Sequence, residues 1–346
     1  MAETDAAFTR VAHLLAAAGL PGLVSLLPLQ GGRNNRAYLL ETNDGQRAFL
    51  KVYFRHPGDA RDRFGAETAL LAHAEALGID RVARVLAADR EAGLVILEFI
   101  YGRKLAPEEI DAGRVAEALD FYLALNRRSA GLPDASEACF SPEQHLACVR
   151  RRVDRLASAA RQGEMRADGA AFVADELVPA WRTIEAAILQ RAARLPGGAA
   201  AVLPRELRRI SPSDFGFHNA LLTPRGTLAF LDFEYAGMDD PAKLVCDFFC
   251  QPEVPVPRGL LPTFLAGVAQ ASSDDAALGA RVRLLFPAYG VKWCCIMLND
   301  FLPMDGARRA FAEAGPASSR LDRQLALARG SLTQYLAVQE MSDEGN

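Results

Sequence analysis

Three polar side chains that follow one another along the chain could do chemistry together. Asp214 and Asn219 lie in the loop-like stretch "SDFGFHNALL", and Asp232 follows the next apolar segment. Most aspartates and asparagines in such loops form turns. If strand 220–222 pairs with strand 228–231, however, Asn219 and Asp232 lie side by side, and Mg²⁺ prefers such oxygen ligands together with phosphate and water. Asp214 would then be the group left to accept a proton.

A lysine and a glutamate form a second candidate group. Lys51 lies in the middle of the apolar stretch "RAFLKVY". Taken alone, such a lysine more often extends its stem to water. Glu67, however, shares the helix face that carries Phe64, Leu70 and Leu71, so an acid stands on the apolar side of this helix. Because an unpaired buried charge is costly, we expect the two charges to pair and to fix the lysine where it can bind phosphate oxygens.

A pair of glycines precedes Lys51 by about one hairpin. Gly31 and Gly32 let the backbone approach a ligand closely, and the N–H groups of such a turn can bind phosphates. Alone, a glycine pair marks an ordinary turn more often than a binding loop. The order along the chain carries more weight. A glycine turn, a strand lysine, a helix glutamate, an aspartate, an asparagine and a further aspartate match the template of phosphoryl transfer.

The hydrophobic pattern predicts which elements hold these residues. Alternating apolar residues and the turn at Asn43-Asp44-Gly45 indicate a strand-rich first part with one helix after Pro57. We therefore predict a bilobal α+β fold, with a small five-stranded antiparallel lobe containing one helix in residues 1–100 and a larger, mainly helical lobe in residues 101–346. The expected strands are 23–29, 37–41, 47–54, 82–88 and 93–100, and the expected helices are 5–19, 59–77, 106–128, 142–162, 170–194 and those after 241.

Composition and charge limit the class of protein. The chain has 346 residues, of which 50% are hydrophobic and 24% are charged, which is ordinary for a globular protein with two cores. A formal net charge of −4 gives no electrostatic basis for binding nucleic acid. No apolar run reaches the length of about 20 residues that spans a bilayer, and the acidic start lacks signal-peptide features. We expect a cytoplasmic protein whose six cysteines are reduced and mostly buried.

Taken together, the motifs resemble the aminoglycoside phosphotransferase / choline kinase family of enzymes, which have a protein-kinase-like fold. The first half of the likeness covers a glycine-rich loop, a lysine strand, a helix with a glutamate and a hinge, in "GGRNNRAYLL", "RAFLKVY", "RFGAETALL" and "LVILEFIYG". The second half covers the catalytic loop and the metal-binding segment, in "SDFGFHNALL" and "FLDFEYAGMDDPAKLVCDF". The resemblance spans about residues 28–250.

The resemblance implies an enzyme that transfers the γ-phosphate of ATP, or of another nucleoside triphosphate, to a hydroxyl of a small molecule with the help of Mg²⁺. The acceptor would be aminoglycoside-, choline- or sugar-like. Asp214 would be the catalytic base, Asn219 and Asp232 would bind Mg²⁺, and Asp247 would brace the catalytic loop. The implied nucleotide contacts are Gly31, Gly32, Asn35, Lys51, Glu67 and the backbone from Glu98 to Ile100.

One departure from the family pattern precedes Asp214. The family usually has His-Gly at this place, whereas this chain has Pro212-Ser213, which calls the loop geometry into question. His218 does not fill the missing position; we expect it to pack or to form a turn, with a substrate contact as the second interpretation. One alternative is therefore an inactive nucleotide-binding scaffold with a kinase fold. A protein kinase is another, although the short segment after Asp232, which no Ala-Pro-Glu follows, leaves little space for an activation loop.

Overall fold

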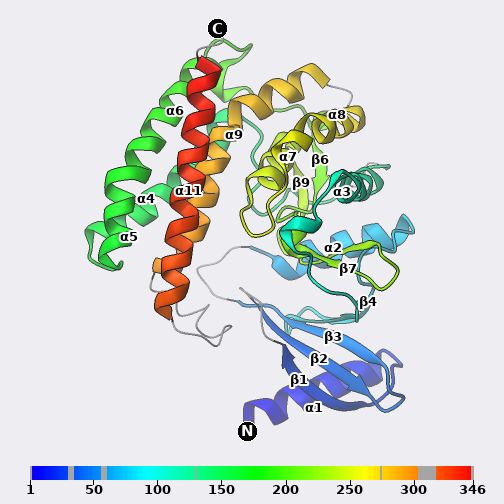
Figure 1. The fold of residues 1–346 in the computed structure, drawn as a ribbon. Coiled ribbons are helices and arrows are strands. Elements are labelled where there is room, and N and C mark those ends of the chain that lie inside the picture. Colours follow the sequence, from blue (N-terminus) through cyan, green and yellow to red (C-terminus); the bar gives the residue numbers. More distant parts are fainter. Residues whose placement is uncertain are drawn as a thin grey trace.

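The chain folds into two lobes, and its two termini lie at opposite ends of the molecule (Figure 1). The computed structural model describes residues 2–29, 35–55, 61–128, 131–272, 275–302 and 317–343. The smaller lobe contains a five-stranded sheet, and the larger lobe is mostly helical. This is the α+β architecture that the sequence predicts.

The elements follow the predicted order, and their ends differ from the predicted ones by a few residues. The strands are β1 (Leu23–Leu29), β2 (Arg36–Thr42), β3 (Arg47–Val52), β4 (Val85–Asp89), β5 (Leu94–Glu98), β6 (Arg209–Ser211), β7 (Ala220–Leu222), β8 (Leu228–Phe230) and β9 (Gly237–Asp239). The helices are α1 (Ala2–Ala17), α2 (Arg63–Ala76), α3 (Ala112–Leu125), α4 (Pro142–Arg161), α5 (Ala167–Phe172), α6 (Val178–Ala192), α7 (Pro241–Cys250), α8 (Leu261–Ser272), α9 (Asp275–Leu298) and α11 (Ala317–Asp343).

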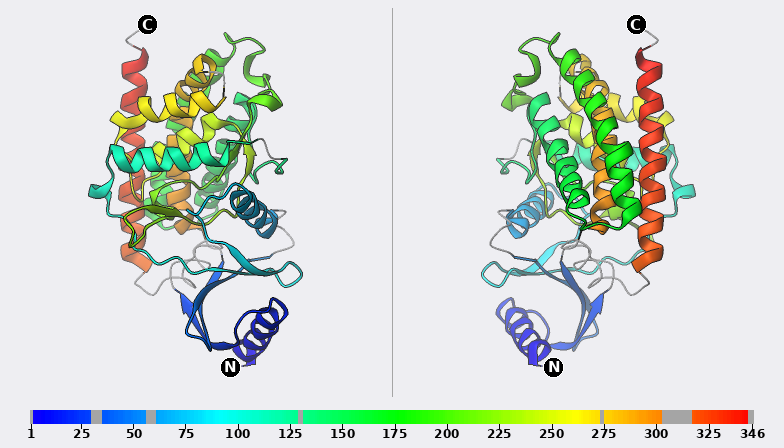
Figure 2. Two further views of the ribbon diagram at one scale, coloured as in Figure 1. Left: turned by 90° about the vertical axis from the view of Figure 1, so that its right-hand side faces the viewer. Right: turned by 90° about the vertical axis from the view of Figure 1, so that its left-hand side faces the viewer.

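The sheet of the smaller lobe separates two groups of side chains. Its strands are antiparallel in the order β1-β2-β3-β5-β4. Successive residues of a strand point to opposite faces, so Leu50 and Ile96 pack with Val11 and Leu15 of α1, while Lys51 faces the other side. Figure 2 shows that α1 covers the face turned away from the helical lobe. The lobe thus has a second helix besides α2, on the opposite face of the sheet.

Helix α2 joins the two lobes. It begins after Asp62, whose carboxylate accepts a hydrogen bond of 2.8 Å from the Gly65 N–H as a helix N-cap. Its buried face carries Phe64, Glu67 and Leu70. The apolar members of this face belong to one continuous core that also contains many phenylalanines of the larger lobe. Glu67 is therefore held at the junction between the lobes.

The larger lobe has a second core among α4, α6, α9 and α11, which lie side by side in Figure 1. The single helix that we predict over residues 170–194 consists of the end of α5 and all of α6, joined by a π-helical turn at Val173–Leu177. Each of the six cysteines is a buried, free thiol, as predicted. Among the described residues, none of the helices combines the length and the apolar character that a bilayer crossing requires.

Two short antiparallel strand pairs complete the larger lobe. Strand β6 pairs with β9, and β7 pairs with β8. The β7–β8 hairpin is bonded to the loop between α2 and β4 of the smaller lobe, because the Phe230 N–H donates to the Arg81 carbonyl over 2.8 Å. This hairpin carries two of the predicted site residues to the junction of the lobes.

Candidate active site

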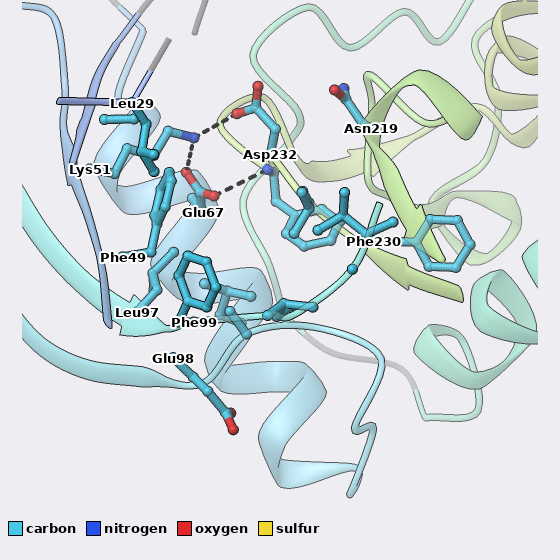
Figure 3. A pocket seen from close by; sticks show the side chains of 18 of the residues that line it. Leu29, Phe49, Lys51, Glu67, Leu97, Glu98, Phe99, Asn219, Phe230 and Asp232 are labelled. Carbon is cyan, nitrogen blue, oxygen red and sulfur yellow. Dashed lines mark hydrogen bonds and ion pairs between the residues drawn. The ribbon is translucent and has the colours of Figure 1, made fainter. Parts of the chain in front are cut away.

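Lys51 and Glu67 form the buried ion pair that the sequence predicts. The Lys51 Nζ atom lies 2.6 Å from Glu67 Oε2 and 2.6 Å from Asp232 Oδ1 (Figure 3). The side chains of Lys51 and Glu67 are 8% and 3% exposed, whereas that of Asp232 is 41% exposed. Burial by itself would lower the pKa of Lys51, but the attraction of Asp232 and Glu67 outweighs burial and raises this pKa above its usual value. Lys51 is therefore a fixed positive charge.

Tyr53 supports this ion pair. It lies two residues after Lys51 along an extended chain, so both side chains leave the backbone on the same side. The Tyr53 hydroxyl donates to Glu67 Oε2 over 2.6 Å, and the Phe233 N–H donates to Glu67 Oε1 over 3.4 Å. Burial and the charge of Glu67 raise the pKa of Tyr53 above its usual value, so the hydroxyl keeps its proton. Both oxygens of Glu67 are bonded, which fixes this carboxylate.

The β7–β8 hairpin brings Asn219 and Asp232 together, as predicted. Leu222 pairs with Leu228, and at the open end of the hairpin the Leu231 N–H donates to the Asn219 carbonyl over 2.8 Å. Asp232 follows directly and has a left-handed backbone with φ of 65°. This conformation costs a residue with a side chain roughly 1–2 kcal/mol. Strain of this kind is typical of functional sites.

Asp214 is held by two neighbours in residues 211–219, which we call the aspartate loop. Its Oδ2 atom accepts a hydrogen bond of 3.2 Å from Asn219 Nδ2, and its backbone carbonyl accepts one of 2.9 Å from the same amide. Its Oδ1 atom lies 3.1 Å from His218 Nε2. The Asp214 side chain is 37% exposed, so a ligand can reach it. The loop therefore presents an oriented carboxylate to solvent.

The Pro212-Ser213 lead-in has a structural role of its own. Ser213 Oγ donates to the Tyr235 carbonyl over 2.8 Å, and the Ser213 N–H donates to Ser211 Oγ over 3.1 Å. Ser213 has a φ of 68°, and in the described part of the chain it shares left-handed backbone among non-glycine residues only with Asp232. The serine hydroxyl thus joins the aspartate loop directly to the segment that carries Asp232.

A cavity of about 420 Å³ lies between the sheet and the β7–β8 hairpin (Figure 3). Its size and its mixed lining are those of a small-molecule site. An apolar slot beside a charged end could hold a flat ring and the phosphates attached to it. The apolar wall includes Phe49, Leu71, Leu97, Phe99, Leu221 and Phe230, and the polar wall includes Lys51, Glu67, Asn219 and Asp232.

The segment after β5 closes one side of this cavity. Arg103 and Leu222 exchange backbone hydrogen bonds of 3.0 and 2.8 Å. Gly102 is needed for this approach, because a Cβ atom there would lie 2.9 Å from the Leu222 carbonyl oxygen. Lys104 follows, lines the cavity and donates from Nζ to the His218 carbonyl. The cavity therefore has a second lysine in its wall.

The charges and donors near Lys51 fit a divalent cation. Lys51 faces two carboxylates, Glu67 and Asp232, and the charge of Glu234 also acts on it, so the local charge is negative. Because Asn219 Nδ2 donates to Asp214, the amide oxygen of Asn219 is the atom that could bind a metal. Two oxygen ligands suit Mg²⁺ when phosphate and water supply the rest. Among the described residues there is no group of three or more His, Cys, Asp or Glu that could hold a metal.

Most of the predicted nucleotide and metal contacts line the cavity. They are Asn35, Lys51, Glu67, Glu98, Ile100, Asn219 and Asp232. Gly31 and Gly32 lie outside the described residues. The side chain of Asn35 is engaged by the protein, since it donates to Glu234 and accepts from the Phe54 N–H over 3.1 Å. Its assignment as a nucleotide contact stays a prediction.

Two of the predicted residues have contacts that narrow their roles. The Glu98 carboxylate points away from Lys51 (Figure 3) and pairs with Arg84 over 3.0 Å, and the Glu98 N–H donates to the Arg84 carbonyl over 2.9 Å. That N–H is therefore not a donor for a base. Asp247 binds Lys292 Nζ through both oxygens, each over 2.8 Å, and accepts from Trp293 Nε1 over 2.9 Å. If Asp247 supports the aspartate loop as we predict, it would do so through its contacts with Lys292 and Trp293 of α9.

Comparison with protein families assigns the chain. The model of the phosphotransferase enzyme family matches residues 25–285. This protein is a member of the phosphotransferase enzyme family. Comparison of the sequence with curated proteins gives no match.

Solved structures of other phosphotransferases share the fold. Choline kinase from Cryptosporidium parvum Iowa II is 14% identical, with a TM-score of 0.61 over 93% of this chain and 90% of its own. LicA, a choline kinase from Streptococcus pneumoniae, in complex with AMP is 17% identical, with a TM-score of 0.57 over 94% and 98%. The ADP-bound aminoglycoside phosphotransferase APH(2'')-Ib is 13% identical, with a TM-score of 0.55 over 95% and 99%. At these identities the likeness shows the fold, so the chain is a phosphotransferase-family enzyme with a kinase-like fold.

Three contacts of this phosphotransferase were missed by reasoning from its sequence. The Tyr53 hydroxyl could have been found, because the residue two places after Lys51 on a strand shares its side. The Ser213 hydroxyl and the His218 imidazole belong to residues outside regular helices and strands. At such residues no hydrophobic periodicity predicts where a side chain points. His218 was expected to pack or to form a turn; it does lie in a 3-10 turn, Phe217–Asn219, and it also contacts Asp214.

Proposed function

We propose that this protein is a kinase that transfers the γ-phosphate of ATP to a hydroxyl group of a small molecule and requires Mg²⁺. The observation that carries the proposal is the meeting of Lys51, Asp232 and Asn219 in one cavity, with Asp214 bonded to Asn219 beside it. In a phosphotransferase, these residues would supply a phosphate-binding cation, two metal ligands and a proton acceptor at one place.

The nucleotide would lie in the cavity with its base against the apolar wall and its phosphates at Lys51. The backbone near Ile100 is the proposed contact for the base. Glu67 and Tyr53 would hold the tip of Lys51 in place before the nucleotide arrives. Asn219 and Asp232 would hold Mg²⁺, which when bound neutralises part of the phosphate charge.

The transfer itself would depend on Asp214. A carboxylate oxygen of Asp214 accepts the proton of the acceptor hydroxyl while the hydroxyl oxygen forms a bond to the γ-phosphorus. The bond from that phosphorus to the oxygen shared with the β-phosphate breaks, and ADP leaves. Lys51 stays cationic throughout because its pKa is raised, so it offsets charge on the phosphates.

The segment after Asp232 supports a small acceptor over a protein. The chain reaches α7 at Pro241 within a few residues, and Phe233, Glu234 and Asp239 are buried on the way. A segment packed in this way has no long exposed arm on which a peptide could dock. We therefore favour an aminoglycoside-, choline- or sugar-like acceptor over a protein kinase activity.

The first experiment measures thermal unfolding with ADP, ATP and a non-hydrolysable ATP analogue, each with and without Mg²⁺. A ligand at 100 times its dissociation constant stabilises the folded state by about 2.7 kcal/mol, so we expect a clear rise in Tm that Mg²⁺ increases. The matched control is Asp232→Ala, in which the Mg²⁺-dependent part of the rise should disappear. Absence of stabilisation by every nucleotide at millimolar concentration would overturn the proposal.

The second experiment is a screen for the acceptor. ADP formation is measured with aminoglycosides, choline-like amines, sugars and amino-alcohols. An inactive nucleotide-binding scaffold predicts stabilisation by nucleotide but no transfer to any of these or to water. Transfer that is lost in Asp214→Asn would exclude the scaffold and support the assigned base.

A further inference from the structure

His218 contacts the proposed base through one ring nitrogen. The Nε2 atom lies 3.1 Å from Asp214 Oδ1, and the His218 side chain is only 7% exposed. Asn219 Nδ2 bonds the other oxygen of the same carboxylate over 3.2 Å. A carboxylate has about four acceptor sites, so these two donors and a substrate hydroxyl can bind Asp214 together.

The contact fixes the tautomer of the imidazole. An ionised carboxylate can only accept hydrogen bonds, so Nε2 carries the hydrogen that points to Asp214. The Nδ1 atom is buried and has no hydrogen-bond partner in the described part of the chain. An unprotonated Nδ1 is less costly in this place than a protonated one, because a buried N–H donor without an acceptor destabilises the fold. The ring is thus oriented to donate to Asp214.

Two neighbours hold the ring in this orientation. On the Nδ1 side lies Gly216, where a Cβ atom would come within 2.7 Å of Nδ1 and 2.9 Å of Cε1. The ring also meets that of Trp293 edge to face, with centroids 6.0 Å apart and planes at 82°. Trp293 is in turn fixed by its hydrogen bond to Asp247, which is paired with Lys292. A chain of contacts therefore runs from α7 and α9 to the aspartate loop.

We propose that His218 is a positioning residue that sets the orientation of the Asp214 carboxylate for transfer of the acceptor proton. The inference rests on the proposed kinase function. In this account the hydrogen bond from Nε2 holds Oδ1, the amide of Asn219 holds Oδ2, and Gly216 leaves the space that the imidazole needs. Asp247 supports the base through Trp293 and His218. His218 neither accepts the substrate proton nor binds the nucleotide.

The test compares four variants of the full chain. His218→Phe keeps a flat ring but removes the donor. His218→Gln restores a donor, because its Nε2 is separated from Cα by the same number of bonds as Nε2 of histidine. His218→Asn places its amide nitrogen one bond short and should not restore it. Gly216→Ala leaves the imidazole intact but forces the ring to move.

The readouts are kcat and KM for ATP, measured as ADP formation with the acceptor found in the screen and with water. We expect His218→Phe to lower kcat by about 10- to 100-fold, because misplacement of a reacting group by about 1 Å has effects of this size. KM for ATP should stay within twofold of the wild-type value. The Mg·ADP-dependent rise in Tm should equal that of the wild type within error. His218→Gln should recover most of the lost kcat, His218→Asn should not, and Gly216→Ala should lower kcat.

The outcomes separate this inference from the proposed function. An active wild type with an equally active His218→Phe would overturn the positioning role alone. So would a His218→Gln variant as slow as His218→Phe, or a fall in Mg·ADP stabilisation that parallels the fall in kcat, because the residue would then act through the fold. A wild type that binds no nucleotide and transfers no phosphate would overturn the proposed function and this inference with it.

Discussion

The cluster around Lys51 and the aspartate loop both hold carboxylates at the junction of the lobes, but they hold them with different partners. Glu67 and Asp232 are bonded to an ammonium group whose side chain is 8% exposed. Asp214 is bonded to an amide and an imidazole and is 37% exposed. The first cluster is thus centred on a buried cation, whereas the second is a loop that holds a partly exposed carboxylate.

This difference matches two different tasks. Because a fixed cation attracts phosphate oxygens, we propose that the Lys51 cluster binds the phosphates and, together with Asn219, the metal. Because the Asp214 carboxylate is oriented by two side chains and can be reached from solvent, we propose that it accepts the proton. Substitutions in the two clusters should accordingly have different effects on stability and on turnover.

The largest loss of stability is expected for Lys51→Met. The change leaves Glu67 buried without its cation, and removing one partner of a buried ion pair costs about 3–5 kcal/mol of the free energy of unfolding. Nucleotide binding should be lost with it. Urea unfolding of the purified variant measures the first effect, and the Mg·ADP-dependent rise in Tm measures the second.

A double variant provides the control for Lys51→Met. In Lys51→Met/Glu67→Leu the unpaired charge is gone as well, so much of the stability should return while nucleotide binding stays lost. Because the pKa of Lys51 is raised above its usual value, its ion pairs contribute fully below about pH 10. The stability difference between wild type and Lys51→Met should thus be the same at pH 6 and pH 9. A single variant as stable as the wild type would contradict the importance of the buried Lys51–Glu67 ion pair for stability.

The Lys51 cluster was largely predictable from the sequence. Glu67 lies on the apolar face of α2, and Lys51 lies inside an apolar strand. Because a buried charge without a partner is costly, the pairing of these two residues could be predicted. The meeting of Asn219 with Asp232 was predictable because a tight hairpin fixes its register. Both inferences rest on regular secondary structure, in which the spacing of residues along the sequence determines where their side chains point.

The second effect in size is expected for Tyr53→Phe. This variant removes the hydroxyl that donates to Glu67 over 2.6 Å but leaves the ion pair. Loss of a buried hydrogen bond to a charged group costs about 1.5–3 kcal/mol, so we expect a decrease in unfolding free energy smaller than that of Lys51→Met. Denaturant titration of both variants checks the order. If Tyr53→Phe were the more damaging change, Lys51 would not be the centre of the cluster.

The aspartate loop was predicted only in part. The spacing of Asp214 and Asn219 singled them out as candidates, whose roles stay predictions, but the orientation of His218 and Ser213 was not predicted. Both lie in irregular backbone, where a 3-10 turn and a left-handed residue set the directions of the side chains. The position of α1 on the second face of the sheet was also not predicted. The hydrophobic pattern of the first strands does not indicate which helix covers that face.

The smallest effect is expected at Ser213, for which two substitutions can be compared. Ser213→Ala loses the hydrogen bond to the Tyr235 carbonyl and keeps a side chain at a φ of 68°, which should cost about 1 kcal/mol. Ser213→Gly loses the same bond but relieves roughly 1 kcal/mol of backbone strain, so its stability should be close to that of the wild type. Thermal unfolding of the two variants measures this difference. A glycine variant less stable than the alanine variant would contradict the proposed backbone strain at Ser213.

The most direct test of the different tasks is a comparison of Mg·ATP binding and phosphoryl transfer in Asp214→Asn. The variant keeps the size of the side chain but cannot accept a proton as a carboxylate does. We predict that Mg·ATP affinity stays within about twofold of the wild type while kcat falls by about 100-fold or more, which is the typical contribution of a general base. Transfer at the wild-type rate, or loss of Mg·ATP binding in step with turnover, would contradict the assignment of proton transfer to the aspartate loop and of binding to the Lys51 cluster.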